Sequence, residues 1–144
     1  MAANRMLDEF MNILIKEGAS DLHLAEGRVP VIRVSGFLVP LIKNPVLTLA
    51  DIKDLLDIFL SAKNKKEFEE QNEIDFAYSH NGKERLRGNA YVQMGKISIA
   101  LRLISSKIKT FQELNLPQIL EQFAKRQQGF FLVVGPAGQG KSTT

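Results

Sequence analysis

Hydrophobic residues recur at two different spacings along this chain. In residues 5–18 they fall three and four positions apart, as one face of an α-helix requires, and Gly18 stands where a C-terminal cap is expected. In residues 20–41 hydrophobic and polar residues alternate, with turn signals at Glu26-Gly27 and Ser35-Gly36. The pattern predicts an amphipathic helix followed by three short strands in an antiparallel meander.

Helical spacing returns in residues 48–62, where Thr48 is a candidate N-cap and Asp51 stands at the capping-box position that usually holds Glu. A charged third helix is expected near residues 65–70. Alternation resumes in residues 74–104, with Asn81-Gly82 as a strong hairpin signal and Gly95 marking the next turn. The sum is about six strands in one antiparallel sheet with two or three flanking helices, an α+β domain.

Four phenylalanines follow the periodicity of the predicted core: Phe10, Phe37, Phe59 and Phe76. We expect them to pack inside the domain rather than to form a stacking surface for nucleic-acid bases.

The pattern changes after residue 104. Residues 105–118 are polar, contain Pro117 and are typical of a linker, and a short helix is predicted from Gln118 to Lys125. The hydrophobic run 129–134, GFFLVV, is typical of a strand buried on both faces of a parallel sheet. The predicted organisation is therefore a domain at 1–110, a linker with a short helix at 111–128, and the start of a different domain at 129–144.

The last ten residues contain a phosphate-binding motif. Gly135, Gly140, Lys141 and Ser142 satisfy G-x-x-x-x-G-K-[ST], directly after the predicted strand that this motif requires. Its glycines let successive backbone N–H groups converge on phosphate oxygens, while the lysine reaches the β- and γ-phosphates and the serine hydroxyl binds Mg²⁺. The predicted ATP site consists of Gly135, Pro136, Ala137, Gly138, Gln139, Gly140, Lys141, Ser142 and Thr143, with Ser142 as the metal ligand. The alternative is a glycine-rich turn with an incidental lysine.

Composition limits the remaining classes. The chain has no cysteine, which argues against a disulfide framework and for a reducing cytoplasm. No hydrophobic run approaches the length of a membrane span, so no membrane insertion is expected. The net charge is only +3, and the one lysine cluster, 63–66, is followed by acidic residues. This favours a solvated helix face over a nucleic-acid patch.

The order of several segments resembles a known family. GASDLHLAEGRVPVIRVSGFLVPL, then RLRGNAYVQMGKISIALRLI, FQELNLP and GPAGQGKSTT are together similar to the type IV pilus retraction ATPases of the PilT kind, within the type II and type IV secretion ATPase superfamily. The resemblance implies a PAS-like N-terminal domain ahead of a RecA-like α/β core, with ATP and Mg²⁺ between them. It also implies a homohexamer at the inner face of the cytoplasmic membrane that acts on a pilus platform protein during twitching motility.

The resemblance also implies roles for single residues. Arg87 and Arg102 match the arginines with which the N-terminal domain contacts the terminal phosphate, and with Lys141 they are the expected catalytic residues. The alternative for both arginines is a surface strand position paired with a nearby Glu. Arg85 is expected to face solvent. Asp21 and His23 match a characteristic family stretch, but a turn or cap is favoured there over acid–base chemistry.

Everything that follows the phosphate loop in the family is missing after Thr144, including the catalytic glutamate and the second acidic motif. The expectation is therefore a motor cut within its core, inactive as these 144 residues alone. Two alternatives stay open: a non-enzymatic PAS-like interaction module with a vestigial phosphate loop, and an assembly or secretion ATPase of the same superfamily. An unrelated P-loop kinase or ATPase is disfavoured by the order of the matching segments.

Overall fold

The computed structural model of the chain describes residues 2–104, 110–136 and 140–141. The chain divides into two compact units, Met1–Ser106 and Lys107–Thr144. Within the described residues no helix is both long enough and hydrophobic enough to cross a membrane.

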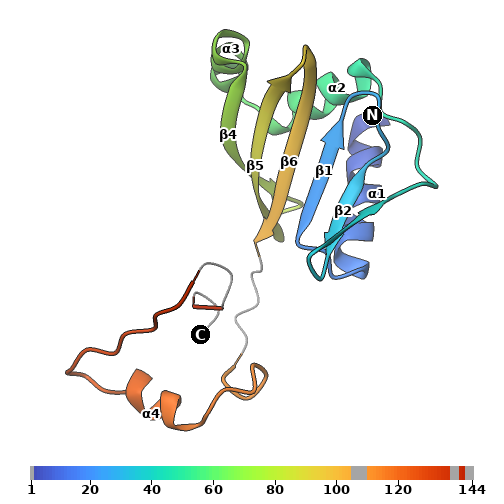
Figure 1. Cartoon of the computed structure of the whole chain (residues 1–144). Helices are drawn as coiled ribbons and strands as arrows, with labels where there is room; N and C mark the ends of the chain where they lie inside the picture. Colours follow the sequence, from blue (N-terminus) through green and yellow to red (C-terminus); the bar gives the residue numbers. More distant parts are fainter. Residues whose placement is uncertain (1, 105–109, 137–139, 142–144) are drawn as a thin grey trace. The chain divides into compact units, whose positions relative to one another are not determined.

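The first unit contains three helices and one sheet (Figure 1). Its elements are α1 (Ala2–Lys16), β1 (Asp21–Ala25), β2 (Val31–Val34), β3 (Phe37–Pro40), α2 (Leu49–Phe59), α3 (Ala62–Gln71), β4 (Glu73–His80), β5 (Glu84–Gln93) and β6 (Lys96–Ile104). The strand order is β3-β2-β1-β6-β5-β4, and every neighbouring pair is antiparallel. Two three-stranded meanders are thus joined through β1 and β6, which confirms the predicted α+β class.

The hydrophobic core lies on one face of this sheet, where α1 and α2 cover it (Figure 1). The helices contribute the periodic positions that the sequence pattern singled out, and the strands contribute alternate residues. The most deeply buried side chains include Leu7, Phe10, Met11, Leu14, Leu22, Leu24, Ile32, Ile52, Leu55, Leu86, Ile99 and Leu101. The opposite face of the sheet carries the intervening residues, and it is here called the open face.

Tight turns connect β2 to β3, β4 to β5 and β5 to β6, whereas the five residues 26–30, which begin with the predicted Glu26-Gly27 turn, join β1 to β2. Asn81 and Gly82 both have positive φ, 49° and 68°, between β4 and β5, and Ser35-Gly36 and Met94-Gly95 do the same in the other hairpins. Turns with positive φ at their central residues match the right-handed twist of the paired strands. The predicted turns are therefore confirmed.

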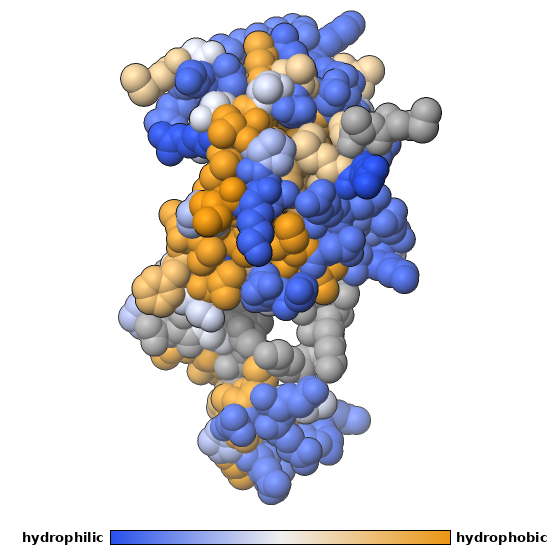
Figure 2. Space-filling model, turned by 90° about the vertical axis from the view of Figure 1, so that its right-hand side faces the viewer, coloured by the Kyte–Doolittle hydropathy of each residue, from blue (hydrophilic) through white to orange (hydrophobic). Residues whose placement is uncertain are grey.

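The core prediction is wrong for one of the four phenylalanines. Phe10, Phe59 and Phe76 are buried, whereas Phe37 is 76% exposed. It lies on β3, an edge strand whose four residues are all exposed. Figure 2 faces the side of the first unit where β2 and α1 lie, and hydrophobic surface gathers there. Alternation alone could not reveal that both faces of this edge strand are exposed in the described part of the chain.

The second unit has little regular structure among its described residues. The predicted short helix is present as α4 (Ile119–Ala124), and Thr110 and Glu113 exchange side-chain and backbone hydrogen bonds across a turn that follows Thr110. The buried strand predicted at 129–134 is wrong for this structure: Phe130–Val134 form no strand and are exposed. A strand needs a neighbour for its backbone ladder, and none of the described residues pairs with this run.

Candidate functional site

Four ionisable residues lie in register across the open face. Arg87 on β5 is opposite Arg102 on β6, Arg102 is opposite Asp21 on β1, and Asp21 is opposite Arg33 on β2. Directly opposed residues of antiparallel strands point to the same side of a sheet. Arg87, Arg102, Asp21 and Arg33 therefore form one line across four strands, here called the charged row.

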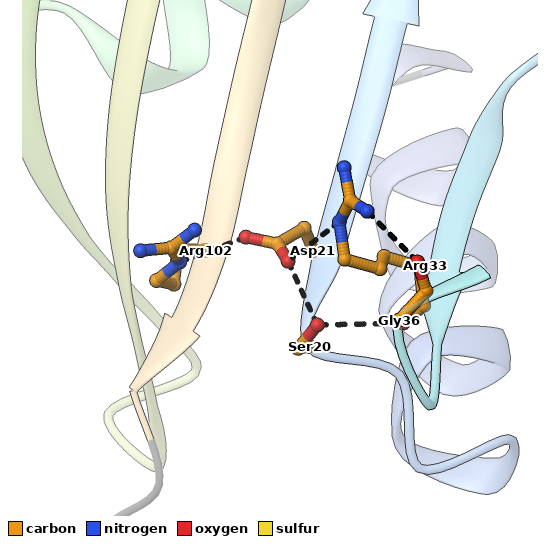
Figure 3. A network of polar contacts seen from close by, with 5 residues as sticks. All are labelled: Ser20, Asp21, Arg33, Gly36 and Arg102. Atoms are coloured by element: carbon orange, nitrogen blue, oxygen red, sulfur yellow. Dashed lines mark hydrogen bonds and ion pairs between the residues drawn. The ribbon is translucent and has the colours of Figure 1, made fainter. Parts of the chain in front are cut away.

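Asp21 is the centre of the row (Figure 3). Its side chain is only 9% exposed, and it accepts hydrogen bonds from Ser20 Oγ at 2.7 Å and Arg102 Nε at 2.8 Å, with Arg33 Nε at 3.4 Å. Burial raises the pKa of Asp21, but the hydrogen bonds from Ser20 and Arg102 and the charges of Arg102 and Arg33 outweigh it. The pKa therefore lies below its usual value, and the carboxyl is ionised at neutral pH.

The two arginines beside Asp21 are held differently. Arg33 is fixed at both ends, because its Nη1 also donates to the Gly36 carbonyl at 3.0 Å. Arg102 is bound through Nε, and its two terminal nitrogens make no hydrogen bond within the described part of the chain. Its side chain is 71% exposed, so this end of the guanidinium is accessible to an anion.

Arg87 has its own carboxylate. Its Nη2 lies 3.2 Å from Asp75 Oδ2, and both side chains are well exposed, at 70% and 61%. Two arginines directly opposed on neighbouring strands would repel each other. Each is instead paired with a different aspartate, Asp75 for Arg87 and Asp21 for Arg102. Arg85 is exposed, as predicted.

These contacts correspond to the alternative of surface arginines paired with acidic residues, although the partners are aspartates. They leave the phosphate-binding assignment of Arg87 and Arg102 a prediction. Sequence reasoning missed Arg33 altogether. Arg33 belongs to the charged row only because the β1–β2 register places it opposite Asp21. In the sequence, only the alternation of residues 31–34 indicated which face of the sheet it occupies.

His23 lies two residues along β1 from Asp21 and so on the same face. Its Nε2 is buried and has no hydrogen-bond partner among the described residues. Burial lowers the pKa of His23, the charges of Arg33 and Arg102 lower it further, and Asp21 opposes them. The side chain also borders a concavity of about 630 Å³ on the open face. No group of metal-ligating residues occurs in the described ranges.

The phosphate-loop motif lies in the second unit. Gly135 and Pro136 are exposed, and Gly140 has a positive φ of 82° that suits glycine. The Lys141 ammonium donates to the Pro136 carbonyl oxygen at 2.6 Å, so the lysine turns back onto its own loop. The other predicted site residues, Ala137, Gly138, Gln139, Ser142 and Thr143, lie outside the described residues.

Comparison with known proteins gives consistent matches. The chain is 38% identical over 138 residues to the type IV pilus retraction ATPase PilT of Pseudomonas aeruginosa, covering 96% of this chain and 40% of that protein. It is 31% identical to the type IV pilus ATPase PilU of the same organism, covering 95% and 36%. No protein-family model matches.

Solved structures agree with these relatives. The crystal structure of the pilus retraction motor PilT with bound ADP aligns with a TM-score of 0.79 at 36% identity, covering 94% of this chain and 39% of that one. The ATPase DotB of Legionella pneumophila aligns at 0.78 with 25% identity, covering 96% and 39%.

The proteins matched are ATPases, and PilT and PilU are named as ATPases of type IV pili. The resemblance predicted from the sequence is confirmed: the chain corresponds to the N-terminal part of the PilT-like ATPases of the type II and type IV secretion superfamily. It spans about two fifths of the length of the relatives it matches.

Proposed function

We propose that this chain is the N-terminal portion of a hexameric, ATP-hydrolysing motor that retracts type IV pili. The observation that carries the proposal is the match to a pilus retraction ATPase along 96% of the chain. A related motor of known structure binds ADP, which supports a nucleotide as ligand. The motor would act at the inner face of the cytoplasmic membrane on a pilus platform protein, and the first unit would be its PAS-like domain. These matches do not favour the non-enzymatic alternative.

In the proposed site the phosphate loop and the charged row act on the same nucleotide. Lys141 would bind the β- and γ-phosphates, and its present acceptor, the neutral Pro136 carbonyl, is one that a phosphate oxygen can replace. Ser142 would hold Mg²⁺, which supplies positive charge to the phosphates. Arg87 and Arg102 would stabilise the charge that develops on the transferred phosphoryl group. Their exposure on the open face supports this assignment.

Substitution of the arginines tests this function in the protein extended through its complete ATPase core. We expect Arg87→Ala or Arg102→Ala to lower kcat by at least roughly tenfold, about 1.4 kcal/mol of barrier, with nucleotide binding nearly intact. Arg85→Ala is the matched control, because Arg85 lies on the same strand and face as Arg87 and is exposed. Steady-state hydrolysis equal to that of the parent in both variants would refute the arginine assignment.

We further propose that these 144 residues alone do not turn over ATP. No acidic residue that could position the attacking water follows Lys141 in this sequence. We expect titration calorimetry to give a Kd for Mg-ATP weaker than about 10 μM. A phosphate-release assay should give no signal above the Lys141→Ala variant. Lysine-dependent release would show that the chain forms a working site without further residues.

A further inference from the structure

The contacts of Arg102 are confined to one edge of its guanidinium. Nε binds Asp21 Oδ1, and the terminal nitrogens point away from that carboxylate (Figure 3). They have no hydrogen-bond acceptor among the described residues. A guanidinium has five donors in a rigid plane, so fixing Nε restricts the direction of the other edge. Arg102 is therefore oriented while its phosphate-binding edge remains available.

Asp21 is more buried and accepts from more donors than Asp75, the exposed partner of Arg87. It is nearly buried, whereas Asp75, the partner of Arg87, is largely exposed. Three donors from β1, β2 and β6 or their ends converge on it: Ser20, Arg33 and Arg102. Breaking a buried charge network is costlier than losing an exposed pair, so this carboxylate is a fixed point of the open face.

The charge balance matters as well. Two guanidinium groups share one carboxylate, so Arg33, Asp21 and Arg102 together retain one positive charge. Asp21 thus orients Arg102 without cancelling the attraction of this site for an anion.

We propose that Asp21 is a positioning residue, which holds the Nε edge of Arg102 so that its terminal nitrogens meet a phosphate group of the bound nucleotide. The inference rests on the proposed function, because it requires that Arg102 contacts the nucleotide. It adds a residue that does not itself touch the substrate and acts through Arg102.

Asp21→Asn in the protein extended through its ATPase core is the test. The amide has nearly the same shape as the carboxylate but loses its charge and presents a donor to the Arg102 and Arg33 donors. We expect kcat to fall at least roughly tenfold and the KM for ATP to stay within about twofold, because orientation matters most in the transition state while the added net positive charge favours anion binding. Asp57→Asn, which removes an exposed carboxylate paired with Lys65, should change neither value by more than about twofold.

A double-variant cycle separates positioning from a structural defect. In an Arg102→Ala background, Asp21→Asn should lower kcat no further, since the residue it acts through is gone. An additional loss there, or unchanged kcat in the single Asp21→Asn variant, would overturn the inference while leaving the proposed function standing. If Arg102→Ala itself retains parental kcat, the arginine assignment fails and the inference falls with it. NMR of the Arg102 Nε–H in the 144-residue chain should show faster hydrogen exchange in Asp21→Asn, and unchanged exchange would also overturn it.

Discussion

Gly88 shows how a single missing side chain shapes this sheet. It lies opposite Phe76 in the β4–β5 register, and the Phe76 ring occupies the space where a Cβ at position 88 would stand. The ring also stacks on Phe59 of α2, with centroids 5.4 Å apart. Glycine usually destabilises the interior of a strand. Here it leaves the space that the Phe76 ring needs in order to pack against α2.

Gly88→Ala should therefore lower the free energy of unfolding by about 1–3 kcal/mol, because the Phe76 ring must move against Phe59 to admit the methyl group. Urea denaturation of the 144-residue chain measures this. Adding Phe76→Leu should make the double variant less destabilised than the sum of the single changes. Additive losses would mean that the ring is not what position 88 must avoid.

His23 predicts a pH dependence at the residue scale. Its pKa in the folded chain is lowered from an ordinary value of 6.5 chiefly by burial, so the unfolded chain takes up the proton more readily. The stability linked to neutral His23 is complete above that ordinary value and is lost as pH falls below it. We expect unfolding free energy to decrease between about pH 7.5 and pH 5.5 more steeply in the parent than in His23→Gln. Equal slopes in urea titrations at these pH values would contradict this assignment.

At the scale of elements, the start of α2 is fixed by a reciprocal cap. Thr48 Oγ1 accepts from the Asp51 backbone N–H at 3.2 Å, and Asp51 Oδ2 accepts from the Thr48 backbone N–H at 2.8 Å. The predicted capping box is thus confirmed, with Asp in the place of Glu. Hydrogen bonding to Thr48 lowers the pKa of Asp51, consistent with an ionised capping group.

Thr48→Ala should cost about 1 kcal/mol of unfolding free energy, since it leaves the Asp51 backbone N–H without its acceptor and removes the hydroxyl that donates to Asp51 Oδ2. Ser61→Ala at the start of α3 is the matched control, because its cap is a single hydrogen bond of 3.3 Å to the Asn64 N–H. We expect a smaller loss there. Thermal or urea unfolding of both variants measures the two losses of unfolding free energy. An equal or larger loss for Ser61→Ala would contradict the prediction that the reciprocal cap of α2 is the stronger one.

At the scale of the whole molecule, the buried hydrophobic residues among those described all lie in the first unit. Its buried hydrophobic residues run from Leu7 to Leu101, whereas the hydrophobic residues Phe130–Val134 of the second unit are exposed. An exposed hydrophobic run of this kind favours association. The first unit is therefore expected to fold by itself.

Residues 1–112 should unfold cooperatively within a few degrees of the Tm of the 144-residue chain, because they retain every core contact. Circular dichroism melts of both chains measure this, and light scattering should show less association for the shorter one. If residues 1–112 are unfolded while the 144-residue chain is folded, the predicted domain boundary near residue 110 is wrong.

The sequence determined the elements of this protein, because their signals are local. Helical spacing, the Thr48 cap and the Asn81-Gly82 turn each involve residues close in the chain. The prediction of about six strands with two or three helices followed from such signals. The phosphate-loop motif is local in the same sense, and so were the segments that carried the family resemblance.

Only the tertiary structure decided which residues meet across the sheet. The charged row joins positions up to 81 residues apart through the β1–β6 pairing, which no local pattern encodes. Pairing also placed Phe37 on an uncovered edge and left Phe130–Val134 without a neighbouring strand among the described residues. The physical reason is that burial and backbone pairing depend on partners distant in sequence, whereas caps, turns and periodicity do not.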